Sequence, residues 1–150
     1  MPIQWRKYLW DEPRLATPQE FEQLEHQWGV TLPEDYKRVA AAHQGMTPEP
    51  GVFDVGRGTN VISVLLTVSG DAGQDDYSAK GAFEVLKPHV PEGIYPFAET
   101  PGGEFVCFDY RESQRRPRIV LVTVEMDIHP IANSFSDFLT ALQQPPLPSP

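Results

Sequence analysis

Apolar residues recur at helical spacing in a segment that begins at Thr17. Phe21, Leu24 and Trp28 follow at intervals of three and four residues, which places them on one face of a helix. The preceding TPQE sequence is typical of a helix start, because threonine and a glutamate three residues later cap each other's backbone amides. Gly29 is a typical helix end. This segment therefore predicts a helix with one buried stripe.

Two further segments carry helix signals. Pro33 opens the first, and Gly45 is expected to end it. Its helically spaced positions are Tyr36, Val39, Ala40 and His43. Ser134 opens the second, with Asp137 three residues later, which predicts another capping box. The apolar face of this last helix is Phe135, Phe138, Leu139 and Leu142.

The remaining apolar runs are short and rich in β-branched or aromatic residues, as strands are. The predicted strands are Val52–Val55, Val61–Val68, Ile94–Ala98, Glu104–Tyr110 and Arg118–Met126, with Ile131–Ala132 as a possible extension. A Pro-Gly-Gly sequence at 101–103 predicts a tight hairpin turn before Glu104–Tyr110, which is apolar enough to be central. Ala82–Lys87 fits either a helical turn or a short strand. Ser69–Ala79 predicts a mobile acidic loop.

Alternation within two of these strands predicts which face the helices cover. The expected covered positions are Ile62, Val64, Leu66 and Val68 on one strand and Val120, Val122, Val124 and Met126 on the other. The opposite positions are mixed, namely Ser63, Leu65, Thr67, Leu121, Thr123 and Glu125. Such a half-polar face suits either a docked partner or plain solvent.

Together these elements predict a single α+β domain with a mixed, mainly antiparallel sheet flanked by N-terminal and C-terminal helices. Residues 1–16 are expected to be a lead-in that packs its aromatic side chains on the domain. Residues 17–142 form the domain, and residues 143–150 form a proline-rich, mobile tail.

Composition narrows the class of partner. The chain has 150 residues and a formal net charge of −9, which disfavours nucleic acid and anionic membranes and attracts a basic partner. Its single cysteine, Cys107, lies in an apolar run, which is typical of a buried free thiol in a reducing compartment. The sequence has no apolar segment typical of a signal peptide or a transmembrane helix. We therefore expect a cytoplasmic protein.

No residue pattern indicates catalysis. Glu125, Asp127 and His129 alternate in a way that a divalent metal can use, but a solvated strand end explains the same alternation, and we predict no metal site and no cofactor. Cys107 has no basic neighbour to activate it. The basic cluster is Arg111, Arg115, Arg116 and Arg118, and it is more typical of a solvated hairpin connection than of a nucleic-acid contact.

The order of these pieces resembles the SUKH superfamily, which includes bacterial immunity proteins and a fungal cell-wall assembly regulator. The resemblance covers about Thr17 to Leu142. It rests on Leu32-Pro33, Tyr36 and Gly45, on the IYPFA strand, on Gly103 and the FVCFD strand ending in Asp109, on Ile131-Ala132, and on the SFSDFLTAL helix. The chain departs from the family pattern at Glu104 and in the Ser69–Ala79 loop. The resemblance implies an α+β fold and a non-enzymatic role, often the neutralisation of a nuclease toxin.

We therefore predict an immunity protein that binds a cognate, basic toxin one-to-one, as a monomer or weak dimer, and blocks it without catalysis. The alternative is a regulatory scaffold for protein partners unrelated to toxins. An acidic surface can cover the substrate-binding surface of a nuclease by imitating phosphate charge. The predicted contact residues are Asp71, Asp75, Asp76, Glu99, Glu104, Glu112, Glu125 and Asp127.

Overall fold

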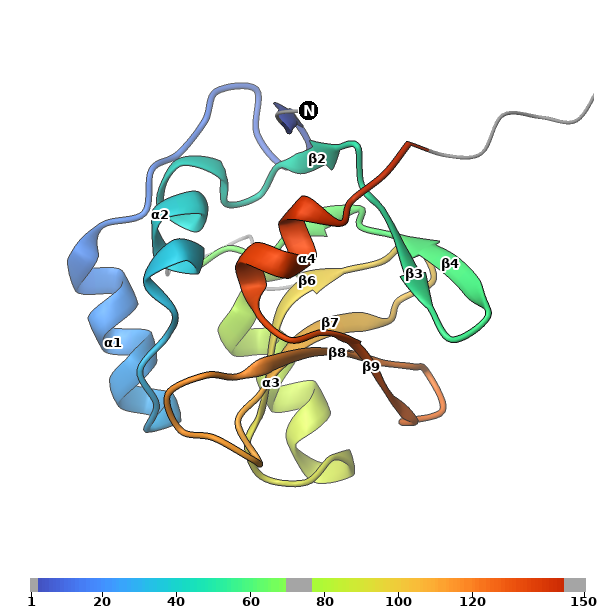
Figure 1. The fold of residues 1–150 in the computed structure, drawn as a ribbon. Coiled ribbons are helices and arrows are strands. Elements are labelled where there is room, and N and C mark those ends of the chain that lie inside the picture. Colours follow the sequence, from blue (N-terminus) through green and yellow to red (C-terminus); the bar gives the residue numbers. More distant parts are fainter. Residues whose placement is uncertain (1–2, 70–76, 145–150) are drawn as a thin grey trace, which may run out of the picture.

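A central antiparallel sheet organises the chain (Figure 1), whose computed structural model describes residues 3–69 and 77–144. The helices are α1 (Pro18–Trp28), α2 (Glu34–His43), α3 (Ala79–Leu86) and α4 (Phe135–Thr140), and a 3-10 helix, η2 (Lys87–His89), follows α3. The strands are β1 (Gln4–Arg6), β2 (Thr47–Glu49), β3 (Val52–Val55), β4 (Gly58–Val61), β5 (Val64–Leu65), β6 (Ile94–Glu99), β7 (Phe105–Asp109), β8 (Arg118–Val122) and β9 (Ile128–Ala132). The five-stranded sheet has the order β5-β6-β7-β8-β9, and the pairs β1-β2 and β3-β4 form two-stranded sheets. This α+β arrangement confirms the predicted fold class.

The predicted hairpin and its central strand are confirmed. β6 and β7 pair from Ile94 opposite Asp109 to Glu99 opposite Phe105, and β7 lies in the middle of the sheet. The turn between them is closed by the amide of Gly103, which donates to the carbonyl of Thr100 at 3.1 Å. Gly103 has a φ of 81°, a conformation that glycine adopts without steric cost.

Both faces of this sheet are buried. On one face Phe97 and Phe108 stack with ring centroids 4.4 Å apart, and Tyr36 of α2 and Phe135 of α4 pack edge-on against them. On the other face Cys107 and Val120 form a smaller apolar cluster with Leu86 of α3 and their neighbours. Burial of one such large side chain stabilises the fold by about 1.5–3 kcal/mol.

The predictions about sheet faces were wrong in two respects. Leu121, Leu65 and Thr67 are 2%, 3% and 1% exposed, so at these positions the face that was expected to meet a partner or solvent is part of the core. Conversely, Val124 is 60% exposed, because it lies in a turn beyond β8. Local alternation shows which residues share a face, but not which elements cover that face.

Two predicted strands are shorter than expected. The run Val61–Val68 is divided between β4 and β5. The amide of Ile62 still donates to the carbonyl of Gly51, beside the β3–β4 hairpin, whereas the chain from Val64 onward pairs with β6. The run Arg118–Met126 ends at Val122, after which Met126 adopts a φ of 68° in a tight turn to β9. β9, expected only as Ile131–Ala132, begins at Ile128.

The helix boundaries follow their capping residues closely. Thr17 and Glu20 form the predicted capping box, and Gly29 ends α1 in the left-handed conformation. Ser134 accepts a hydrogen bond from the amide of Asp137 at 3.1 Å, which is one half of the capping box predicted for α4. The segment for which helix and strand were both open belongs to α3 and continues into η2.

Both ends of the described chain contact the domain. Trp5 in β1 stacks on His43 of α2 with ring centroids 4.8 Å apart, and Arg6 pairs with Glu49 of β2. Gln143 exchanges two backbone hydrogen bonds with Val52 of β3. The rest of the predicted tail, residues 145–150, lies outside the described residues, as do residues 70–76.

Candidate functional site

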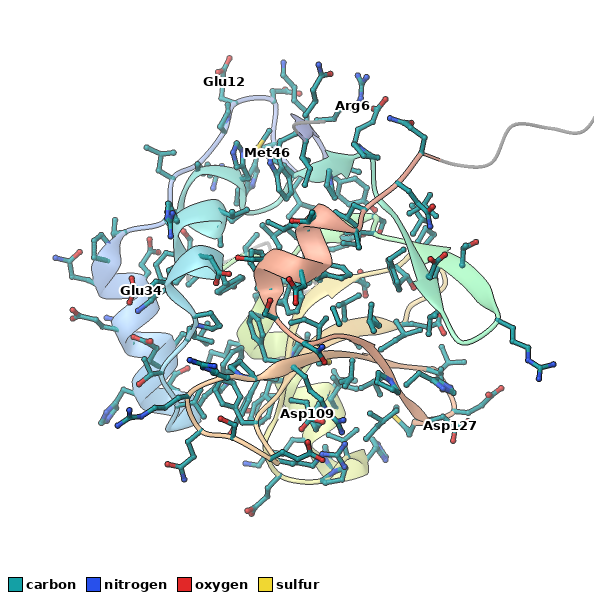
Figure 2. The ribbon with its side chains drawn as sticks, in the orientation of Figure 1. Arg6, Glu12, Glu34, Met46, Asp109 and Asp127 are labelled. Atoms are coloured by element: carbon teal, nitrogen blue, oxygen red, sulfur yellow. The ribbon has the colours of Figure 1, made fainter. Side chains whose placement is uncertain are left out.

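Four of the predicted contact residues lie at one end of the central sheet, which we call the hairpin end. Glu99 ends β6 and Glu104 precedes β7, while Glu125 and Asp127 lie in the turn between β8 and β9. The two turns are neighbours because β7 begins where β8 ends. Figure 2 shows Asp127 at the periphery, projecting away from the domain.

The two glutamates of the β6–β7 hairpin are partly engaged within the protein. The carboxylate of Glu104 accepts hydrogen bonds from the Asn60 side-chain amide at 2.7 Å and from the Thr100 hydroxyl at 3.4 Å. The backbone carbonyl of Glu99 accepts from both the amide and the hydroxyl of Ser63. These contacts fix the hairpin to β4 and to the start of β5.

The two acidic residues of the β8–β9 turn are exposed. Neither Glu125 nor Asp127 forms a salt bridge within the part of the chain that the structure describes. The turn itself is held by Thr123, whose amide donates to the carbonyl of Asp127 at 2.9 Å and whose hydroxyl accepts from the Asp127 amide at 3.1 Å. Val124 lies beside them and is 60% exposed. A rigid turn thus presents two carboxylates and one apolar side chain to solvent.

One predicted contact residue, Glu112, does not join this surface. Glu112 lies in the β7–β8 connection, at the opposite end of the sheet, with its carboxylate 4.0 Å from the guanidinium of Arg118. Asp71, Asp75 and Asp76 lie outside the described residues.

Sequence reasoning did not predict the role of Asp109, whose carboxylate is buried at the end of β7. It accepts hydrogen bonds from Nε and Nη2 of Arg111, both at 3.0 Å, from the Arg111 amide at 2.9 Å and from Nε of Arg118 at 3.1 Å. Burial alone would raise the pKa of Asp109, but these hydrogen bonds outweigh burial and hold the pKa below its ordinary value.

The same contacts change the interpretation of the basic cluster. Asp109 binds both Arg111 and Arg118, so its single carboxylate offsets one positive charge of the cluster. The backbone amides of Arg115 and Arg116 donate to the Ser113 hydroxyl, which shapes the loop. The hairpin connection is therefore a structural clamp as well as a solvated loop.

The chemical alternatives gain no geometric support. No group of three potential metal ligands is assembled within residues 3–69 and 77–144. Glu125 and Asp127 lie in a turn, whereas His129 is paired opposite Leu121 on β9, so the alternation expected for a metal site does not form. Burial, together with the charge of Asp109, raises the pKa of the Cys107 thiol well above its ordinary value, which keeps it protonated and unreactive.

Sequence reasoning also missed a cavity of about 650 Å³ at the end of the sheet opposite the hairpin end. Its walls come from the loops after α1, before β6 and after β7, with Tyr95 and Tyr110 among the lining residues. Gly29 and Gly93, both with positive φ, stand in two of these loops. The two glycines could be recognised in the sequence as loop residues, but the sequence did not show that three loops come together around a cavity.

Comparison with known proteins identifies the family. The family description SMI1 / KNR4 (SUKH-1) matches residues 15–141, and the chain belongs to that family. No curated protein matched the chain. Within its described part, the protein has no helix of the length and hydrophobicity needed to cross a bilayer. Family membership is compatible with an immunity protein and accounts for the order of helices and strands recognised in the sequence.

Proposed function

We propose that this protein is an immunity protein that binds a cognate toxin one-to-one and blocks it without catalysis. The observation that carries the proposal is the acidic hairpin end, where Glu125 and Asp127 form no salt bridge within the described chain. Membership in the SMI1/KNR4 family makes this class of function the natural starting point.

Electrostatics favours a basic partner. The net charge of −9 attracts a positively charged protein over a distance of about one Debye length, roughly 8 Å at physiological salt. A nuclease toxin has to present cationic side chains to its phosphate substrate, and carboxylates can occupy the same positions. The hairpin end therefore suits a toxin that acts on nucleic acid.

The hairpin end also has the local features of a protein interface. Its carboxylates are placed by closed turns, so little conformational freedom is lost on binding. Val124 adds an exposed apolar side chain next to Glu125 in the chain, which provides apolar contact area beside the charges. The three aspartates of the Ser69–Ala79 loop and Glu112 remain parts of the predicted contact set.

A cytoplasmic location belongs to the same proposal. The lone cysteine, Cys107, is a buried free thiol, which is compatible with a reducing compartment. An immunity protein located there meets the toxin after the toxin has entered the cell.

The test uses the protein as bait in a lysate of its own source, with partners identified by mass spectrometry. The matched control is the double variant Glu125→Lys/Asp127→Lys. The proposal predicts a basic, toxin-like partner whose activity stops when this protein is added, and weaker capture by the variant. If the captured partners are only regulatory or housekeeping proteins, the immunity proposal fails and the scaffold alternative takes its place.

A further inference from the structure

The cavity at the end opposite the hairpin end is a second candidate binding site that the proposed function does not use. Its volume of about 650 Å³ lies within the range of about 300–1,000 Å³ typical of ligand pockets. The walls are residues 29–31, residues 92–93 and residues 110–111, with Glu25 and His26 contributed by α1.

Hydrogen bonds between its loops make this cavity rigid. The Tyr110 hydroxyl donates to the carbonyl of Thr31 at 2.7 Å, and the Tyr110 amide donates to the carbonyl of Gly93, also at 2.7 Å. The Tyr95 hydroxyl donates to the carbonyl of Trp28 at 3.1 Å. Each of the three loops is thus tied to another part of the cavity. A preformed site of this kind loses little conformational entropy when a ligand enters.

The charges of the cavity favour a cation. Glu92 is exposed in one wall and forms no salt bridge with any residue of the described chain. Glu25 also lines the cavity, and its carboxylate accepts from the Leu32 amide at 2.6 Å and pairs with Lys37 at 3.2 Å. The last turn of α1 adds the negative end of its helix dipole. Arg111 also lines the cavity, where its guanidinium binds the Asp109 carboxylate that it shares with Arg118.

The carboxylates of Glu92 and Glu25 each affect the pKa of a tyrosine of the cavity. Burial raises the pKa of Tyr95, and the negative charge of Glu92 raises it further. Burial likewise raises the pKa of Tyr110, with Glu25 adding to the shift. The two rings lie 5.8 Å apart at an interplanar angle of 72°. Each tyrosine of the lining therefore lies within electrostatic reach of one of these carboxylates.

We propose that this cavity binds the side chain of an arginine presented by a segment of another protein. A guanidinium is planar, donates hydrogen bonds in several directions and packs against aromatic rings, so it matches the carboxylate of Glu92, which is unpaired within the described chain, and a tyrosine lining. The site lies at the other end of the sheet from Glu125 and Asp127, and it functions independently of toxin binding. The protein then has one interaction surface at each end of the sheet.

The experiment titrates the isotope-labelled full chain with the peptide acetyl-Gly-Arg-Gly-amide and follows backbone amide signals by NMR. Saturable shifts are expected at residues 25–31, 92–95 and 110–114. The same peptide with citrulline in place of arginine keeps the shape but removes the charge, and we expect it to bind about fivefold or more weakly.

Variants locate the site. Glu92→Gln should weaken arginine-peptide binding about fivefold, whereas Glu84→Gln, an exposed position of α3 that does not line the cavity, should leave it unchanged. The unliganded spectrum of each variant shows whether the fold is retained. Shifts that do not saturate, an equal affinity for the citrulline peptide, or an unchanged affinity in Glu92→Gln would overturn the proposal.

Discussion

Phe105 at the start of β7 lies directly opposite Val122 at the end of β8. This register brings the turn at residues 100–104 beside the turn at residues 123–127, although the eighteen residues 105–122 lie between them in the chain. Four carboxylates consequently lie at one end of the sheet, and the proposed toxin-binding surface depends on this pairing. The register also places the Asp109 clamp at the other end.

The first prediction concerns the charges of the hairpin end. Glu125→Lys/Asp127→Lys should slow association with the partner about tenfold at low salt and much less at high salt, because screening removes long-range attraction. Stopped-flow or surface-based kinetics measures this rate. Asp11→Lys/Glu12→Lys is the matched control, since it makes the same charge change in the exposed N-terminal segment. Equal slowing by both variants would show that net charge matters and the hairpin end does not.

The second prediction concerns the buried carboxylate of Asp109. Asp109→Asn leaves Arg111 and Arg118 without their shared partner and should lower the free energy of unfolding by about 2–3 kcal/mol near pH 7. Urea denaturation measures the change. Glu112→Gln, whose carboxylate is exposed and only 4.0 Å from Arg118, should change it by less than about 0.5 kcal/mol.

The contribution of Asp109 to the free energy of unfolding should also depend on pH. Because its folded pKa lies below the unfolded value of about 3.9, its contribution is complete above that value and is lost as the pH falls through the folded pKa. The stability difference between wild type and Asp109→Asn should therefore shrink on acidification from about pH 5 to about pH 2. A difference that stays constant over this range would contradict the assigned role.

The third prediction concerns His43, which stacks on Trp5. Burial lowers the pKa of His43, so the unfolded chain binds a proton more readily than the folded one. Stability should consequently fall as the pH drops from about 7.5 to about 5.5, with this residue contributing less than about 1 kcal/mol. His43→Phe should flatten that slope in thermal unfolding, and His129→Gln, on the exposed face of β9, should keep it. An unchanged slope in His43→Phe would contradict the prediction.

The fourth prediction concerns the capping box of α1. The Thr17 hydroxyl accepts from the amide of Glu20 at 3.2 Å, while the Glu20 carboxylate accepts from the amide of Thr17 at 2.9 Å. Thr17→Ala should lower the free energy of unfolding by about 1 kcal/mol. Thr31→Ala, at an exposed loop position, serves as the control and should change it by less than about 0.5 kcal/mol. Equal losses in the two variants would show that the cap contributes nothing specific.

The features predicted correctly from sequence depend on residues close together in the chain. Thr17 and Glu20 define a helix start over four residues, and the Pro-Gly-Gly turn defines a hairpin over three. The predicted length of the strand Val61–Val68 was wrong, because a run of β-branched residues shows a preference for strand but does not show which strand it will pair with. In this fold the run is divided between two different sheets.

The sequence predicted which kinds of residue form the candidate site, but not which of them lie together in the fold. Glu112 and Glu125 are close in sequence, but β8 runs between them and places them at opposite ends of the sheet. Asp109 and Arg118 are also register partners, a pairing that fixes the position of the turn but cannot be read without knowing the hairpin. The cavity requires three loops to meet, and no short segment of sequence encodes that meeting.

The most direct test of the central claim measures inhibition of the captured toxin at increasing amounts of this protein. The account predicts that toxin activity falls linearly and is abolished at one equivalent. It also predicts that Glu125→Lys/Asp127→Lys needs a clear excess to reach the same inhibition at low salt. Full toxin activity in the presence of excess wild-type protein, with the complex shown to form, would contradict the claim that binding neutralises the toxin.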